Sequence, residues 1–174
     1  FEAYQARLGP LHPETLSAAH GLAMMLKNTQ HYAEAEALLR ATFEARKLKL
    51  GPADAATLET ALELASLLWR SGLLEEAEPF LRSTHDNRRS QLGPEHDKTL
   101  DAANDLALLL KQLGSMPEAE ALYRSTYATR RRRRGGDDEL TINSAMSLAL
   151  LLKQTSRYDE AEALYRRAYD ARTR

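Results

Sequence analysis

The 174-residue sequence contains no cysteine, and its formal net charge is only −1. Without cysteine the chain can form neither disulfides nor thiolate-based metal and catalytic sites. A net charge near zero gives no overall field that would select nucleic acid or an anionic membrane. The lack of cysteine fits a reducing compartment, so an intracellular, by default cytoplasmic, location is expected.

Long apolar runs are also missing. The longest are about five residues, as in LALLL at 106–110 and again at 148–152. Because a membrane-spanning helix needs about 20 apolar residues, no direct membrane insertion is expected.

What the sequence does contain is a strict repeat with a period of 42 residues. The stretch LGPLHPETL at 8–16 returns as LGPADAATL at 50–58, as LGPEHDKTL at 92–100 and, more divergent, as RGGDDELTI at 134–142. EAE triplets keep the same step, at 34–36, 76–78, 118–120 and 160–162. A period without insertions predicts a stack of identical units, because each unit must present the same face to its neighbour.

Each unit has the pattern of two helices. Apolar residues spaced by three and four form one stripe in the first segment and another in the second, as in Leu16, Ala19, Leu22, Ala23 and Leu26, followed by Tyr32, Ala35, Leu38, Leu39 and Phe43. The linkers between units predict a helix stop and a helix start. A glycine ends one helix with a left-handed residue, and Asp54, Asp138, His12 and His96 stand at the N-cap of the next.

This pattern resembles the tetratricopeptide repeat (TPR), in the 42-residue form of kinesin light chains. The resemblance is carried by the Leu22-Ala23 pair and its copies, the EAE opening of each second helix and the LGP-x-H-P-x-T-L linker. It implies an all-α fold, a right-handed α-solenoid of antiparallel helix pairs. We expect residues 1–174 to form one array, in which 1–7 is the tail of a preceding repeat and the four repeats are 8–49, 50–91, 92–133 and 134–174.

Neither end of the sequence has the polar capping unit that a solenoid needs. The chain is therefore expected to be a slice of a longer array, or an array whose ends are covered by partners.

No group of residues indicates an enzyme or a cofactor site. The linker histidines His12 and His96 occupy equivalent places in separate repeats, so they are not expected to converge on a metal ion. Paired acids such as Glu34 and Glu36 point in different directions on a helix. The sequence predicts no catalytic, cofactor-binding or metal-binding residues.

The run Arg130 to Arg134 leaves three interpretations open. Cations near a helix C-terminus interact favourably with the helix dipole, which favours a solvated helix end. A contact to an acidic protein partner and a nucleic-acid or nuclear-import role are the alternatives. No nucleic-acid partner is expected.

In TPR arrays the first helices line a concave groove, and residues outside the apolar stripe face it. This resemblance implies a partner-binding surface made of His20, Met24, Lys27, Glu59, Leu62, Trp69, Arg70, Asp101, Asn104, Lys111, Met146, Leu150 and Lys153. These positions vary between repeats, as expected either of an individually shaped surface or of drift on a solvent face. Trp69 is the only tryptophan, a residue type enriched at binding hot spots.

Two non-catalytic functions remain open. The first is a protein–protein interaction scaffold that forms a structural part of a larger assembly. The second is an exchangeable adaptor that binds short peptides in the groove. Kinesin light chains hold cargo with asparagines in a Leu-Asn-Asn-Leu-Ala pattern, and only Asn104 fits that pattern here. The scaffold is therefore preferred, with a peptide or a folded subunit as partner.

Overall fold

The structure is a computed structural model that describes residues 2–173. In this range it contains nine helices and no strand. The helices are α1 Glu2–Leu8, α2 Pro13–Asn28, α3 Tyr32–Leu50, α4 Ala55–Arg70, α5 Leu74–Leu92, α6 Asp97–Gln112, α7 Met116–Arg134, α8 Glu139–Gln154 and α9 Tyr158–Arg172.

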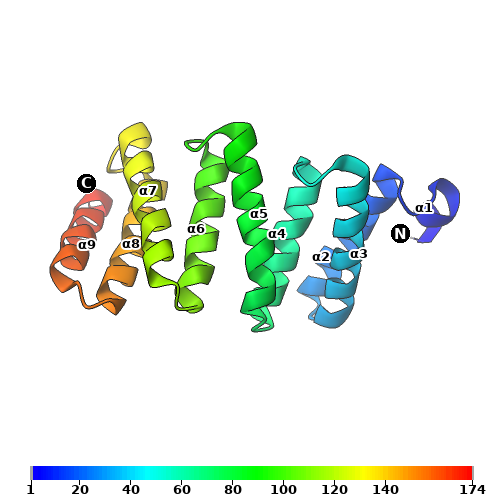
Figure 1. The fold of residues 1–174 in the computed structure, drawn as a ribbon, viewed down its shortest axis with the longest axis horizontal. Coiled ribbons are helices and arrows are strands. Elements are labelled where there is room, and N and C mark those ends of the chain that lie inside the picture. Colours follow the sequence, from blue (N-terminus) through cyan, green and yellow to red (C-terminus); the bar gives the residue numbers. More distant parts are fainter. Residues whose placement is uncertain (1, 174) are drawn as a thin grey trace. The chain divides into compact units, whose positions relative to one another are not determined.

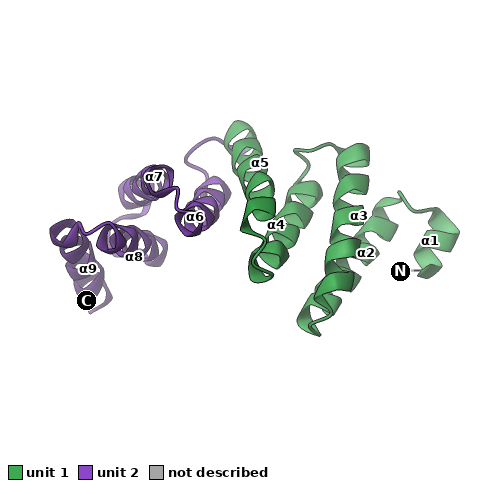
Figure 2. Cartoon of the chain, turned by 60° about the horizontal axis from the view of Figure 1, so that its bottom comes forward, with its two compact units in different colours: residues 1–91 green, residues 92–174 purple. Residues whose placement is uncertain are grey.

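The chain divides into two compact units, which Figure 2 distinguishes by colour. Unit 1 covers residues 1–91, and unit 2 covers residues 92–174. The division falls between the second and third expected repeats. The expectation of one continuous array stays a prediction.

Within each unit successive helices run antiparallel and lie side by side (Figure 1). We call α2, α4, α6 and α8 the first helices and α3, α5, α7 and α9 the second helices. Each first helix is joined to the following second helix by a short turn. The fold is an all-α helical-repeat solenoid, as the sequence predicts.

The predicted N-caps are confirmed. The side chain of Asp54 accepts a hydrogen bond from the backbone N–H of Ala56 at 2.9 Å. His12 fills the same place with its ring, because Nδ1 accepts from the backbone N–H of Glu14 at 3.3 Å. Each cap satisfies a donor that the first turn of a helix leaves unpaired.

The linker glycines differ from the prediction in one angle. Gly51 has φ 95° and ψ 160°, and Gly135 has φ 89° and ψ 170°. The positive φ was expected, but the ψ values lie outside the left-handed helical region. They place both residues in an extended region with positive φ that essentially only glycine reaches.

The apolar stripe of the first helices forms the core. The small column Ala23, Ala65, Ala107 and Ala149 is fully buried. The adjacent leucine column is buried in three repeats, but Leu22 is 37% exposed whereas Leu148 is 2% exposed. The helix before α2 is the seven-residue α1, which has no buried residue and is too short to cover Leu22.

Candidate partner-binding surface

The predicted surface residues lie on the first helices, and the structure divides them between the two units. None of them is fully buried. Unit 1 holds His20, Met24, Lys27, Glu59, Leu62, Trp69 and Arg70, and unit 2 holds Asp101, Asn104, Lys111, Met146, Leu150 and Lys153.

The predicted cations of unit 1 already have partners within the chain. Lys27 Nζ lies 2.7 Å from Glu63 Oε2, which ties α2 to α4. Arg70 Nη2 donates to the hydroxyl of Tyr32 at 2.8 Å, and its guanidinium lies 5.2 Å from the centre of that ring. Trp69, which is aligned with Lys27 in the repeat and precedes Arg70, is half-buried.

Sequence reasoning missed a buried arginine beneath the unit 1 surface. Arg46 of α3 is 4% exposed. Its Nη1 donates to the backbone oxygen of Ala56 at 2.9 Å and to Thr60 Oγ1 at 2.7 Å, both in α4. Thr60 Oγ1 also lies 3.5 Å from His20 Nδ1 in α2. We call Arg46, Thr60 and His20 the unit 1 junction, because they join three helices.

Unit 2 has an equivalent junction 84 residues later. Arg130 of α7 is also 4% exposed, and its Nη1 donates to Ser144 Oγ in α8 at 2.8 Å. Its Nη2 lies 2.5 Å from Asp101 Oδ1 in α6. We call Arg130, Ser144 and Asp101 the unit 2 junction.

The two junctions differ at three aligned positions, Ser17/Asp101, His20/Asn104 and Thr60/Ser144, and the first of these adds a carboxylate beside the arginine. The residue that precedes the buried arginine by 29 places is Asp101 in unit 2 and Ser17 in unit 1. Arg130 therefore has a carboxylate in direct contact, whereas Arg46 has hydroxyl and carbonyl partners. Burial lowers the pKa of the Arg46 guanidinium, against the opposing charges of Glu59 and Asp54.

His20 is affected by the same junction. Burial lowers the pKa of its imidazole below the usual 6.5, and the positive charge of Arg46 lowers it further. Glu59 and Glu63 oppose this shift. The lowered pKa favours a neutral His20 ring beside the Arg46 charge.

The solvated-helix-end interpretation of the Arg130–Arg134 run is wrong for Arg130. Helical spacing turns this residue toward α8, where it is buried. Three of its neighbours form ion pairs with the linker acids of unit 2, with partners Glu95 for Arg132, Asp97 for Arg133, and Asp97 and Asp138 for Arg134.

The signal that could have found these arginines is in the repeat itself. Arginine recurs at the same step of 42 in every unit of the pattern, at Arg46, Arg88, Arg130 and Arg172. In this column Arg46 and Arg130 are buried, whereas Arg88 is half-buried and Arg172 is exposed, so the column marks the aligned positions but does not by itself predict burial.

Among the described residues, no group of three or more histidine, aspartate and glutamate side chains is arranged to hold a metal ion. No helix of the described part is long and apolar enough to cross a membrane.

Solved structures with the same fold come from several proteins. A candidate kinesin light chain from Podosopora anserina with nearly identical TPR-like repeats has a TM-score of 0.89 at 23% identity, covering 98% of this chain and 81% of that one. BtubC (BKLC) from P. vanneervenii has a TM-score of 0.81 at 15% identity, covering 91% of this chain and 63% of that one. MamA has a TM-score of 0.69 at 17% identity, covering 99% and 86%. At these identities the likeness shows the fold.

A comparison with curated proteins gives no significant match. Two tetratricopeptide repeat families match the sequence, one over residues 55–132 and 101–174 and the other over residues 15–55. These matches cover most of the chain. The chain therefore belongs to the tetratricopeptide repeat family, whose members serve as protein–protein interaction scaffolds.

Proposed function

We propose that this chain is a non-catalytic scaffold that holds protein partners as a structural part of a larger assembly. The observation that carries the proposal is the pairing of polar side chains on the first helices. Lys27 is held by Glu63, Arg70 by Tyr32 and Asp101 by Arg130. An exchangeable peptide would have to break these pairs, whereas a permanent partner can cover them as they stand.

The apolar residues of the same surface also support the proposal, because a partner that covers this face would bury them. Leu62 and Met146 are half-buried, and Leu150 is exposed. Burying such side chains against a folded partner is favourable by about 25 cal/mol per Å² of apolar area. No cofactor, nucleic acid or membrane takes part in this function.

Native mass spectrometry of the protein, isolated gently from its source, tests the proposal. A scaffold subunit stays at fixed stoichiometry in one complex. Recovery of the chain alone, or with several substoichiometric proteins, would contradict the structural role.

An exchangeable adaptor is the second candidate, and the position of Trp69 favours it. Trp69 is half-buried on the predicted surface of unit 1, and tryptophan is enriched at binding hot spots. Trp69→Ala should then lower the affinity for a peptide bound in the groove more than tenfold. Unchanged binding in a fluorescence titration would remove this candidate.

A further inference from the structure

The second helices of unit 2 border a cleft. This cleft is separate from the predicted partner-binding surface on the first helices. Two cavities, of about 230 Å³ and 350 Å³, lie between α7 and α9 with α8 beneath them. Both are lined by Tyr127 and Arg167, so they are neighbours along one cleft. We call this cleft the unit 2 seam.

At the corresponding place in unit 1, two aromatic rings, one from α3 and one from α5, are in contact. Phe43 and Phe80 meet edge to face, with ring centres 5.2 Å apart and an angle of 82° between the planes. A shift of 84 residues converts this pair into Tyr127 and Leu164. The second ring is therefore absent from the unit 2 seam.

Other substitutions enlarge the same space. Pro79 and Thr84 of unit 1 correspond to Ala163 and Ala168 of unit 2. Ala163 lines the larger cavity, and Ala168 lines the smaller one. The larger space is a cleft open to solvent rather than an enclosed cavity, so a partner side chain can enter it from the surface.

Charge on the seam changes as well. In unit 1, Lys47 lies 5.6 Å from the centre of the Phe43 ring and 3.7 Å from Glu44. Its counterpart Arg131 has no acidic partner among the described residues, because the equivalent of Glu44 is Ala128. Arg167, which replaces Ser83, likewise has no ion pair in the described part of the chain.

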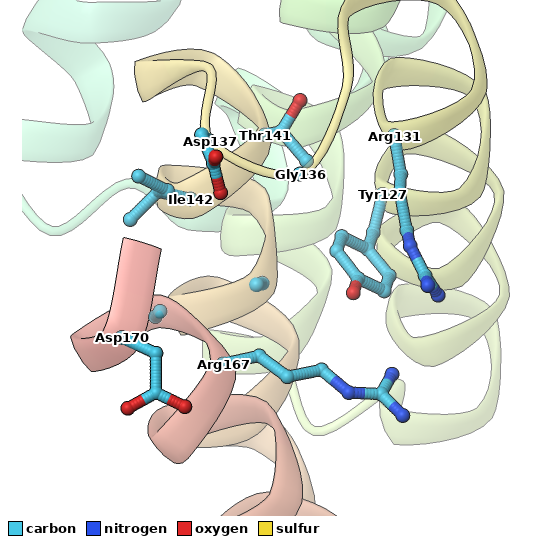
Figure 3. A pocket seen from close by; sticks show the side chains of 10 residues that line it. Tyr127, Arg131, Gly136, Asp137, Thr141, Ile142, Arg167 and Asp170 are labelled. Atoms are coloured by element: carbon cyan, nitrogen blue, oxygen red, sulfur yellow. The ribbon is translucent and has the colours of Figure 1, made fainter. Parts of the chain in front are cut away.

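Figure 3 shows how these side chains lie. The guanidinium groups of Arg131 and Arg167 extend toward the same side of the pocket, next to the Tyr127 ring. The carboxylate of Asp170 points away from them. At the other end of the seam, Arg124 is already paired with Glu160 at 2.9 Å. Arg131 and Arg167, for which no ion pair is seen in the described part of the chain, thus lie beside Tyr127, and Asp137 lines the same pocket.

We propose that the unit 2 seam binds an acidic segment of a partner protein. One large apolar side chain of that segment packs beside Tyr127 and over Ala163 and Leu164, and a neighbouring carboxylate is held by Arg131 and Arg167. This site goes beyond the proposed scaffold function, because it uses the second helices and can be tested without the assembly.

Acetyl-phenylalanyl-glutamate amide is a minimal probe, and acetyl-phenylalanyl-glutamine amide is its uncharged match. Backbone amide shifts of the whole chain, followed by NMR during titration, locate and quantify binding. We expect saturable shifts on α7 and α9 around Tyr127 with the glutamate probe. Affinity for the glutamine probe should be about threefold to tenfold lower, as for loss of one exposed charge pair.

Three variants complete the test. Leu164→Phe copies Phe80 and should abolish binding by filling the seam. Arg167→Ser copies Ser83 and should weaken the glutamate probe about threefold to tenfold. Arg166→Ser removes the same charge one residue away, at a side chain paired with Glu162, and should leave affinity unchanged. Circular dichroism confirms that each variant is folded.

Several outcomes would overturn the proposal. They are equal shifts with both probes, equal effects of Arg166→Ser and Arg167→Ser, or binding retained in a folded Leu164→Phe variant. If oligothymidylate displaced the glutamate probe from the seam at a concentration lower than that of the probe, the site would be assigned to nucleic acid instead. A failed search for a stable assembly would leave these results untouched, so the two proposals fail separately.

Discussion

The two units place the same buried guanidinium in different electrostatic surroundings. Arg130 of unit 2 contacts a carboxylate and a hydroxyl, whereas Arg46 of unit 1 contacts a hydroxyl and a backbone carbonyl. The helices that carry the two residues have equivalent bounds in the repeat. The exchange of Ser17 for Asp101 therefore adds a carboxylate to the junction while the backbone repeat is kept, alongside the exchanges of His20 for Asn104 and Thr60 for Ser144.

This difference shows how a uniform repeat can acquire individual functions. The apolar stripe and the caps preserve the stacking, since every unit must fit its neighbour. Residues at the edges of the stripe can vary between repeats, because they are not needed for one unit to fit its neighbour. In unit 1 these residues leave Arg46 without a carboxylate contact among the described residues, and in unit 2 they line the seam beside Tyr127.

The largest expected effect comes from the leucine column of the first helices. Leu148→Ala should lower the free energy of unfolding by about 3 kcal/mol, because it leaves a cavity in a packed core. Leu22→Ala, at the exposed end of the same column, should cost about 1 kcal/mol or less. Urea unfolding followed by circular dichroism measures both. Equal losses would show that the two positions are packed alike.

The buried arginines should differ by a smaller amount. Arg130→Met removes hydrogen bonds to Ser144 and Asp101 and should cost about 2 kcal/mol. Arg46→Met should cost about 1 kcal/mol or less, since it also removes the penalty of burying a charge with no carboxylate in contact. Methionine keeps an apolar stem in each case. A greater loss for Arg46→Met would reverse this comparison.

The ion pairs around the second helices should differ less between the two units, and their contribution to stability should depend on salt. In unit 2, Glu120 is held by Arg124 and also by Arg157, whereas the counterpart of Arg157 in unit 1 is Leu73. Arg157→Leu should make the unfolding midpoint less sensitive to NaCl, because screening then acts on fewer exposed pairs. Unfolding between low and high salt checks this. An unchanged salt slope would mean that the Arg157 pairs do not contribute.

His20 should give the smallest effect, visible only as a pH dependence. Because burial and Arg46 lower its folded pKa below 6.5, its contribution to stability is fully present above pH 6.5. That contribution is lost as the pH falls through the folded pKa. The variant His20→Asn, which copies Asn104, should therefore have a free energy of unfolding that depends less on pH between 7.5 and 5.5. A constant difference from the unaltered protein across that window would contradict the assignment.

Much of the fold could be predicted from the sequence, because its signals are local and repeated. Asp54, Asp138 and the linker glycines fix where helices start and stop, and the Leu22-Ala23 pattern fixes the buried face. The helical spacing of apolar residues and the capping chemistry act within a few residues, and the 42-residue period repeats them, so both can be recognised in the sequence.

The site was harder to predict, because its properties depend on which side chains meet across helices. The column position of Arg46 was visible, but its contact with Thr60 requires the packing of α3 on α4. The seam was missed for a similar reason. The exchange of Phe80 for Leu164 is a conservative change within an apolar stripe, and its consequence appears only beside Tyr127.

The most direct test of the central claim is a pair of double-mutant cycles on the two junctions. One combines Ser17→Asp with Arg46→Met, and the other combines Asp101→Ser with Arg130→Met, with urea unfolding as the measurement. If residues 17 and 101 decide whether the buried guanidinium has a carboxylate partner, both cycles should give a coupling of about 1 kcal/mol. No coupling in the Ser17→Asp cycle, with coupling kept at Asp101, would show that the two junctions are not equivalent and would contradict the account.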